Sequence, residues 1–287
     1  MAQTLEFLTR QQATLTSIRS IVHTMKTLSA INANPYEQAA HSIEAYRQTL
    51  LQGFAAFAHR TGQLQAEPHN TQQQLLIVFG SDHGLCGNYN ELLAEKVAAY
   101  CQQHSNKQFT ILCIGAQMSD ALEAAGAPPK EVLLPPASAE GIGRLAAGLV
   151  SEVEAFSHGQ ELTRSAVLLA FTKRAEHHVR DPQIQTLLPL DPSLLTRPTR
   201  WDSRSLPDYT LPAETLLAAL LRSYLFASVF SAAAEAMVTE NAARLALMQQ
   251  AEQSVDERLE EVQGDLNYVR QTDITNELMD VIIGHLE

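Results

Sequence analysis

Proline and positive charge are scarce in the last quarter of this 287-residue chain. No proline follows Pro212, so a helix can run from there to the C-terminus. Residues 211–287 carry four Lys or Arg against thirteen Asp or Glu, whereas residues 1–60 carry five against three. This acidic excess argues against nucleic-acid binding, because proteins that bind nucleic acid present basic surfaces.

Long apolar runs are also missing. No continuous apolar stretch approaches the length needed to cross a bilayer, so we expect no direct membrane insertion. The N-terminal residues lack the apolar core of a signal peptide and the Arg-rich composition of a transit peptide. The three cysteines, Cys86, Cys101 and Cys113, have no CxxC spacing and are expected to be buried thiols. We therefore expect a reduced, intracellular protein without a metal or a cofactor.

The acidic C-terminal segment carries a heptad pattern. Ten residues recur at alternating spacings of three and four, and eight of them are apolar. They are Val238, Asn241, Leu245, Met248, Glu252, Val255, Leu259, Val262, Leu266 and Val269. This pattern is typical of a helix that winds around another helix. Some seventy helical residues would be on the order of 100 Å long, and such a helix needs a partner to cover its seam.

The first sixty residues can supply that partner. Apolar residues recur there at every seventh position, in two sets. The first set is Leu8, Leu15 and Val22, with Ile18 and Met25 in alternate seam positions, and the second is Tyr36, Ile43, Leu50 and Phe57. We interpret the two sets as different in phase, with a kink or stutter at Pro35 where Asn34 caps a restarted helix. The alternative for both ends is a pair of long helices in an ordinary bundle.

The middle of the chain alternates short apolar runs with helical segments. The expected strands cover residues 75–79, 109–114, 132–134, 166–171 and 184–188, the last at a sheet edge because prolines flank it. The expected helices cover residues 90–104, capped by Asn90, 117–125 and 140–156. This order predicts a Rossmann-like α/β domain with a mostly parallel sheet. The chain thus divides into helix 1–60, α/β domain 70–205 and helix 211–287.

A glycine-rich segment between the first strand and the first helix of this domain is a candidate site. It reads Gly80-Ser-Asp-His-Gly-Leu-Cys-Gly-Asn-Tyr-Asn90, where phosphate-binding loops occur in other folds. Its glycines follow GxxxGxxG rather than GxGxxG, and no GK[ST] ending follows. We favour a tight turn that needs unusual backbone angles and close packing over nucleotide binding. The residues of this structural motif are Gly80, Asp82, Gly84, Gly87, Asn88, Tyr89 and Asn90.

Two further patterns have alternative interpretations. His177, His178 and Asp181 resemble part of a metal site, but no third ligand stands at helical spacing, so a surface hairpin tip is favoured. Arg270 and Gln271 lie near the end of the acidic helix. They are either an ordinary solvated pair or a place where a guanidinium makes a bidentate contact with a partner carboxylate.

Three segments carry a resemblance to a known family, the gamma subunit of F-type ATP synthases. Residues 81–90 closely resemble its SDRGLCGGYN motif, and residues 239–248, TENAARLALM, look like its SEHAARMxAM segment. Residues 266–277, LNYVRQTDITNE, match its YNxxRQxxITxE pattern, with leucine in place of the usual tyrosine. The resemblance covers essentially the whole chain.

The resemblance implies a mixed α/β fold in which the two terminal helices form an antiparallel coiled coil with an inserted Rossmann-like domain. It also implies a rotor shaft that turns inside a ring of alpha and beta subunits, with the α/β domain near the epsilon subunit and the membrane c-ring. Such a subunit holds no cofactor and catalyses no reaction, because catalysis lies in the beta subunits. It is peripheral, on the cytoplasmic side of the bacterial inner membrane.

The residues that the resemblance carries over are few. Arg270 and Gln271 match a pair that contacts a beta subunit, with Asn267 and Thr275 on neighbouring turns. Met25 matches a methionine of the family's N-terminal KAMEMV segment. These five residues are the expected partner contacts.

The sequence also departs from the family pattern. The basic SKMRK stretch is replaced by Ile31-Asn-Ala-Asn-Pro35, and the shaft is acidic in a generally basic family. These departures suggest a divergent bacterial or alternate-ATPase branch, and they leave the coupling ion and the direction of work open. Two other functions are considered: a nucleotide-dependent oxidoreductase built on the α/β domain, and a free-standing coiled-coil scaffold.

Overall fold

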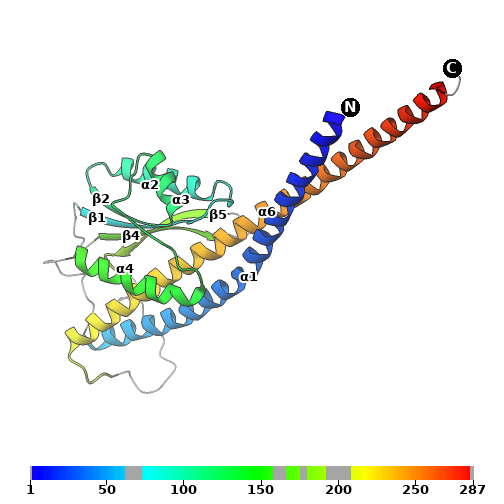
Figure 1. Cartoon of the computed structure of the whole chain (residues 1–287). Helices are drawn as coiled ribbons and strands as arrows, with labels where there is room; N and C mark the ends of the chain where they lie inside the picture. Colours follow the sequence, from blue (N-terminus) through cyan, green and yellow to red (C-terminus); the bar gives the residue numbers. More distant parts are fainter. Residues whose placement is uncertain (1, 62–72, 158–165, 175–179, 192–207, 285–287) are drawn as a thin grey trace. The chain divides into compact units, whose positions relative to one another are not determined.

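The computed structural model describes residues 2–61, 73–157, 166–174, 180–191 and 208–284 (Figure 1). Contacts group the chain into two compact units. Unit 1 comprises Met1–Ala30 and Arg244–Glu287, and unit 2 comprises Ile31–Ala243. Helices α1 (Ala2–Thr61) and α6 (Ala213–Gly284) are both divided between the two units, and each helix contributes one segment to unit 1 and one to unit 2. The division proposed from the sequence has three consecutive segments. The contacts instead group the start of α1 with the end of α6 as one unit and the rest of the chain as the other.

Unit 2 contains the five-stranded sheet that the apolar runs predict. Its strands are β1 (Gln73–Phe79), β2 (Gln108–Ile114), β3 (Glu131–Leu133), β4 (Ala166–Arg174) and β5 (Arg180–Leu188). The strand order is β3-β2-β1-β4-β5, and all neighbouring pairs are parallel except β4 and β5. The order is that of doubly wound sheets. The predicted mostly parallel sheet with an edge strand at β5 is confirmed.

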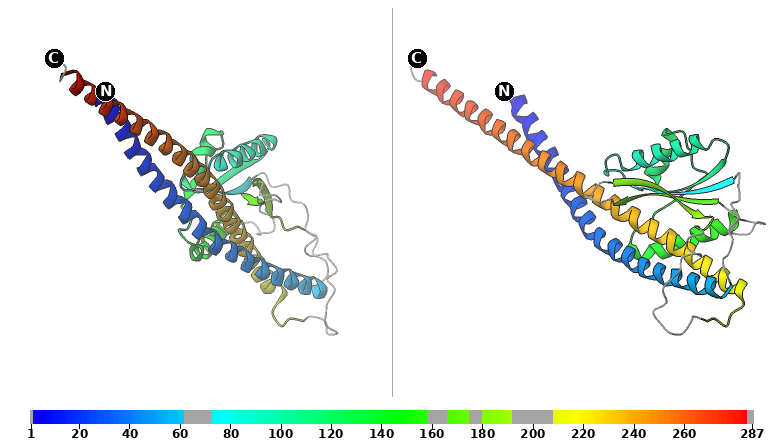
Figure 2. Two further views of the ribbon diagram at one scale, coloured as in Figure 1. Left: turned by 90° about the vertical axis from the view of Figure 1, so that its right-hand side faces the viewer. Right: turned by 180° about the vertical axis from the view of Figure 1, so that it is seen from behind.

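The helices cover both faces of this sheet, as Figure 2 shows in its two further views. Helices α2 (Tyr89–Gln103) and α3 (Ala116–Ala124) share one apolar cluster with one face of the sheet. The opposite face packs against α4 (Ile142–Phe156), which follows a short 3-10 helix, Ala139–Gly141, and against the unit 2 segments of α1 and α6. Alternate residues of the central strand therefore enter different clusters. Leu75 and Ile77 belong to one, and Leu76 and Val78 to the other.

The segments of α1 and α6 within unit 2 pack antiparallel. The Phe54 and Tyr224 rings meet edge to face with centroids 5.9 Å apart, and Phe57 stacks at 6.0 Å on Tyr209, which precedes α6. A Cβ at Gly53 would lie 2.9 Å from Leu220 Cδ2, so the helices approach closely there.

Helix α6 contains a window that is apolar enough to cross a membrane by length and composition. Its mean hydropathy is 1.6 over 18 residues within Ala213–Met279, and it is the one such helix among the described residues. The expectation that no apolar stretch approaches this length therefore has to be corrected. Leu225, Ala227 and Val229 of α6 are buried in the core of unit 2, which explains the apolar composition without a membrane.

The heptad seam of α6 is confirmed, because all ten of its residues are buried or half-buried. In unit 1 the seam packs against α1 in the antiparallel direction. Leu8 of α1 clusters with Val262 and Leu266, whereas Arg19 pairs with Asp256 further along.

The predicted change of phase in α1 is wrong. Its buried apolar residues continue in one heptad register from Leu8 to Phe57, and Ser29 holds the position between Val22 and Tyr36. Ser29 is only 2% exposed, and its hydroxyl donates to the Met25 carbonyl at 2.8 Å. That internal hydrogen bond lets a polar side chain occupy the seam and conceals the continuity of the pattern.

Two other expectations for α1 are also corrected. The helix is uninterrupted from Ala2 to Thr61 with Pro35 inside it, so Asn34 does not cap a restarted helix. Ile18 is 41% exposed and lies outside the seam. Polar contacts from Arg19 and Lys26 to α6 place the partner helix on the other flank of α1.

The first prediction concerns the seam in unit 1. Leu266→Ala removes a side chain that is 1% exposed, so we expect it to destabilise unit 1 by about 2–4 kcal/mol. Amide hydrogen exchange of residues 5–12 and 259–270 measures the effect. Tyr268→Ala is the control, because Tyr268 is 71% exposed and its loss should cost no more than about 0.5 kcal/mol. Equal loss of hydrogen-exchange protection in both variants would contradict the packing of Leu266 between α1 and α6.

The second prediction concerns the acidic residue in the seam. The Glu252 carboxylate accepts a hydrogen bond from Lys26 Nζ, and its Oε1 lies 2.9 Å from His23 Nδ1. The Lys26 hydrogen bond, followed by the His23 contact, lowers the pKa of Glu252 below its ordinary value. The lowered pKa means that this interaction stabilises the fold above the ordinary carboxyl pKa. The contribution is lost as the pH falls through the folded-state pKa.

We therefore expect Glu252→Gln to reduce the free energy of unfolding at pH 7 and to have progressively less effect as the pH falls below about 4. Urea unfolding of both proteins across this range measures the difference. Glu257→Gln removes an exposed carboxylate of the same helix and should show no such pH dependence. A difference for Glu252→Gln that stays constant with pH would count against the ionic contact.

Candidate functional site

The glycine-rich segment folds into a turn between β1 and α2 whose ends are tied by Asn90. The Asn90 side chain accepts from the Ser81 backbone N–H at 3.0 Å and donates to the Ser81 hydroxyl at 2.7 Å. Both residues are buried. The helix begins at Tyr89 with Asn88 in the N-cap position, so the prediction that Asn90 caps this helix is wrong. Asn90 closes the turn instead.

The glycines of the turn serve different purposes. Gly87 has a φ of +67°, which favours glycine, and a Cβ at Gly80 would lie 2.4 Å from the Met118 side chain. These two positions confirm the predicted unusual angle and close packing. Gly84 meets neither requirement, because its φ is not positive and the nearest atom to a Cβ is 3.9 Å away.

Leu85 has an unusual backbone conformation in this turn, which the sequence did not predict. It has a φ of +65° and is 53% exposed, although left-handed backbone is unfavourable for a leucine. Its neighbour Cys86 is buried, with Sγ 3.5 Å from the Ser81 hydroxyl. Asp82 on the other side accepts from the Ala116 N–H at 3.2 Å, at the start of α3. The turn is thus held by contacts on both sides of Leu85.

Tyr89 fastens this turn to α6. Its hydroxyl donates to the Ala236 carbonyl at 2.9 Å and lies 3.3 Å from the Thr239 hydroxyl. Thr239 lies 2.9 Å from the carbonyl of Thr172 at the end of β4. Burial, the largest effect, raises the pKa of Tyr89 far above its ordinary value, so the phenol remains a hydrogen-bond donor.

This arrangement fills the place where doubly wound sheets bind ligands. Such sheets bind nucleotides beyond the carboxyl ends of the two strands that flank the point where the strand order reverses. Here those strands are β1 and β4, and their ends meet Tyr89 and residues 236–243 of α6. Cys86, Tyr89 and Ala243 form a buried cluster there. The geometry supports a structural joint at the position that a nucleotide would need.

The second candidate site is the exposed end of α6 in unit 1. Arg270, Gln271, Asn267 and Thr275 are all exposed, as a partner-binding role requires. The Thr275 hydroxyl donates to the Gln271 carbonyl at 2.8 Å, and the Asn267 side chain accepts from Gln263 at 3.3 Å. The Arg270 guanidinium forms no ion pair within the part of the chain that the structure describes. These four residues lie together on consecutive turns.

Met25, the fifth expected contact, lies elsewhere in unit 1. It is half-buried on α1, next to Lys26, which pairs with Glu252 of α6. Eighteen residues separate Glu252 from Arg270 on the same helix, roughly 27 Å at the rise of an α-helix. The five predicted residues therefore form two separate locations.

Sequence reasoning missed the apolar character of the exposed helix end. Several large apolar side chains beyond Val269 are more than half exposed. They are Ile274, Leu278, Met279, Val281 and Ile282. They lie outside the register of the seam, and among the described residues α1 offers no partner beyond its own first turn. The heptad count, extended past Val269, reaches polar residues at 273, 276 and 280, so the seam pattern could not have revealed them.

The remaining sequence candidate cannot be placed. His177 and His178 lie outside the described residues, although the antiparallel pairing of Arg174 with Arg180 is that of a hairpin. Within the described ranges, no group of three or more His, Cys, Asp or Glu residues could hold a metal ion.

Comparison with known proteins agrees with this architecture. A family model described as ATP synthase matches residues 4–285. The ATP synthase gamma chain of Polynucleobacter necessarius subsp. necessarius is 28% identical, over 88% of this chain and 85% of that protein. The gamma chain of Ralstonia nicotianae is 26% identical, over 99% of each chain.

Solved structures share the fold at lower sequence identity. A chain of the mitochondrial ATP synthase of Euglena gracilis, from a structure of OSCP, F1 and c-ring, has a TM-score of 0.64 and 17% identity. The match covers 98% of this chain and 93% of that one. A chain of the Tetrahymena thermophila mitochondrial enzyme, from a structure of the central stalk and c-ring, has a TM-score of 0.58 and 19% identity. It covers 80% of this chain and 99% of that one.

The fold and the two sites define a class of subunit that combines long paired helices with an α/β domain. The family match over nearly the whole chain makes the assignment specific: the chain belongs to the ATP synthase gamma family.

The third prediction tests the joint between the sheet and α6. Tyr89→Phe removes the hydrogen bonds to Ala236 and Thr239 without changing the volume, so we expect unfolding to become easier by about 1–2 kcal/mol. Urea unfolding of the full chain measures this. Tyr100→Phe, on the same helix but half-buried, should change stability by no more than about 0.5 kcal/mol. Equal changes in the free energy of unfolding in the two variants would show that the hydrogen bonds of the Tyr89 hydroxyl do not stabilise the joint.

Proposed function

We propose that this chain is the central-stalk rotor subunit of a rotary ATP synthase or ATPase. In this role it couples ion translocation through the membrane sector to ATP synthesis or hydrolysis in a ring of alpha and beta subunits. The single observation that carries the proposal is the unequal pairing of the two long helices in a chain of this family. Helix α6 continues past its contact with α1 and exposes Arg270 together with an apolar surface.

An unequal helix end is what a rotor needs. A shaft with identical sides would make the same contacts with each subunit of a surrounding ring and would select no conformation. A shaft with one exposed helix end makes different contacts with each of several identical subunits and so shifts their conformational populations. Catalysis then lies in the beta subunits, and this chain transmits torque without bond chemistry of its own.

The expected contact residues divide into two locations under this proposal. Arg270 and Gln271, with Asn267 and Thr275 beside them, contact a beta subunit at the end of α6. Met25 marks a second contact on α1, roughly 27 Å away along the shaft. The Arg270 guanidinium has no ion-pair partner among the described residues and is available for a bidentate contact with a carboxylate.

The other partners follow from the same role. The α/β domain binds the epsilon subunit, and the stalk rests on the c-ring, so the chain is a peripheral protein on the cytoplasmic side of the bacterial inner membrane. The names of the relatives, gamma chains of ATP synthases, and the central stalk structure support this assignment.

The fourth prediction tests the coupling contact. Arg270→Ala removes a charged hydrogen-bond donor worth about 1.5–3 kcal/mol, so we expect fewer ions pumped per ATP hydrolysed in inverted membranes. Parallel measurement of ATP hydrolysis and of the transmembrane ion gradient gives this ratio. Arg258→Ala is the matched control, because Arg258 lies on the same helix and pairs within it with Glu261.

Assembly is checked by the amounts of alpha and beta subunits that copurify with each variant from native membranes. A normal pumping ratio in fully assembled Arg270→Ala complexes would reject the role of Arg270. A wild-type chain that copurifies with neither alpha nor beta subunits would reject the rotor function itself and favour a free-standing scaffold.

A further inference from the structure

The two helices that pair in unit 1 differ in their intrinsic tendency to be helical. Of the 21 residues 9–29 of α1, twelve are Thr, Ser, Ile, Val or His, which have lower helix propensity than Ala, Leu, Met, Gln, Glu, Lys or Arg. Residues 245–265 of α6 contain only six residues of low propensity among 21. Since propensity adds up along a segment, this part of α1 depends on its partner more than α6 does.

The hydroxyl groups of this α1 segment bond to its own backbone. Seven of its eight Thr and Ser side chains donate to the carbonyl four residues earlier, at 2.8 to 3.0 Å. They are Thr9, Thr14, Thr16, Ser17, Thr24, Thr27 and Ser29. Such hydrogen bonds make no link to the partner helix, and they slightly destabilise the helix that contains them.

Little apolar surface is buried when this segment pairs with α6. Val22 is the one buried apolar residue between positions 9 and 29. Three large apolar side chains of the same segment are 41 to 59% exposed, namely Ile18, Ile21 and Leu28. The polar contacts with α6 are the half-exposed pair of Arg19 with Asp256 and the better covered pair of Lys26 with Glu252. Exposed ion pairs contribute little to stability, so the pairing of this segment is weak.

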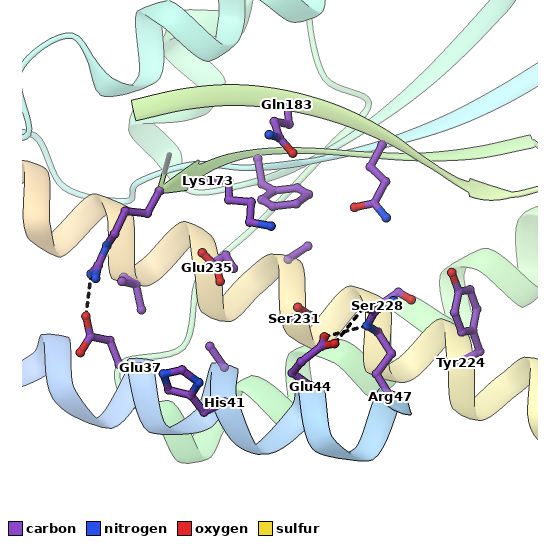
Figure 3. Close-up of a pocket in the computed structure, with 16 residues that line it drawn as sticks. Glu37, His41, Glu44, Arg47, Lys173, Gln183, Tyr224, Ser228, Ser231 and Glu235 are labelled. Carbon is purple, nitrogen blue, oxygen red and sulfur yellow. Dashed lines mark hydrogen bonds and ion pairs between the residues drawn. The ribbon is translucent and has the colours of Figure 1, made fainter. Parts of the chain in front are cut away.

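The part of α1 in unit 2 is packed much more extensively. Tyr36, Ile43 and Leu50 are buried in the core that this part shares with the sheet. Glu37 also pairs with Arg174 of β4 at 2.6 Å (Figure 3). One continuous helix therefore has a firmly packed part in unit 2 and a weakly packed part in unit 1.

We propose that residues 9–29 of α1 are a local folding unit that opens while α6 stays helical and unit 2 stays folded. Proteins open locally where few apolar contacts are buried, and this segment has few. Residues 245–265 keep their helix in the opened state because their propensity is higher and because they extend a helix that unit 2 already fixes.

Opening has a consequence for binding. It uncovers the seam side chains Met248, Val262 and Leu266, which are buried in the closed state. A partner that binds only the closed pair stabilises it, and a partner that binds the uncovered seam favours the opened state. The order of this α1 segment is thus a property that a partner can change. The proposal concerns the chain by itself and does not depend on the rotor function.

Hydrogen–deuterium exchange of the full chain, read by mass spectrometry of its peptides, tests the proposal. We expect amides of residues 9–29 to exchange about tenfold or more faster than those of residues 37–57 and about threefold or more faster than those of residues 245–265. Low urea concentrations should change the rate of residues 9–29 only slightly, because a local opening exposes little surface.

Substitutions that raise helix propensity test the cause. Thr14, Ser17 and Thr24 are exposed and lie outside the seam. Replacing all three, as Thr14→Ala, Ser17→Ala and Thr24→Ala, should slow exchange of residues 9–29 by about tenfold. The matched control is Ser42→Ala with Thr49→Ala, which removes the same kind of hydrogen bond from the unit 2 part of α1 and should leave that rate unchanged.

Three results would overturn the proposal. Equal exchange in residues 9–29 and 245–265 would show that the two helices open together. A rate for residues 9–29 that rises with urea as steeply as that of the unit 2 core would show global unfolding instead of local opening. Unchanged exchange of residues 9–29 in the triple alanine variant would exclude helix propensity as the cause. None of these measurements involves partner subunits or coupling, so their outcome is separate from that of the rotor function.

Discussion

Every part of the structure depends on the fact that one 72-residue helix, α6, is covered differently along its length. Between Leu221 and Val238 its buried residues contact the sheet and α1, and several of them are alanines. From Leu245 to Val269 a heptad seam packs against α1 alone. A sheet face needs small side chains for close approach, whereas a coiled coil needs larger apolar side chains at fixed intervals. The change in composition along α6 therefore sets which partner covers each part.

The joint at Tyr89 shows how the α/β domain is bound to this helix. A doubly wound sheet normally leaves an open crevice where the strand order reverses. In this chain the crevice is closed by a buried phenol that bonds to Ala236 and Thr239 of α6. The strained backbone at Leu85 is maintained because Cys86 and Asp82, on either side, are each fixed by contacts. A fold often used to bind nucleotides is used here to attach a domain to a helix.

Sequence periodicity predicted the regular elements well, since burial on one face leaves a repeat that can be counted. The five strands, their edge at β5 and the α6 seam follow directly from apolar spacing. Errors arose where a polar residue satisfies itself locally. Ser29 bonds within its own helix and so occupies an apolar position, which made one register look like two. Asn90 resembles a helix cap but turns back to Ser81, a partner nine residues away that local rules do not reveal.

The candidate site was less predictable than the fold for a physical reason. Arg270 and its neighbours came from a family motif, since a solvated arginine on a helix leaves no mark in apolar spacing. Arg174 and Glu37 come from a strand and a helix far apart in the sequence, and only the folded unit brings them into an ion pair.

The exposed apolar end of α6 is best understood through its energetic cost. Burying one large apolar side chain contributes about 1.5–3 kcal/mol, so a helix end that exposes Ile274, Leu278 and Val281 lacks this stabilisation in the isolated chain. Contiguous exposed apolar residues usually mark an interaction surface. Under the proposed rotor function, Arg270, at the boundary between the covered seam and the exposed end, is the place where a directional contact distinguishes one orientation from the next.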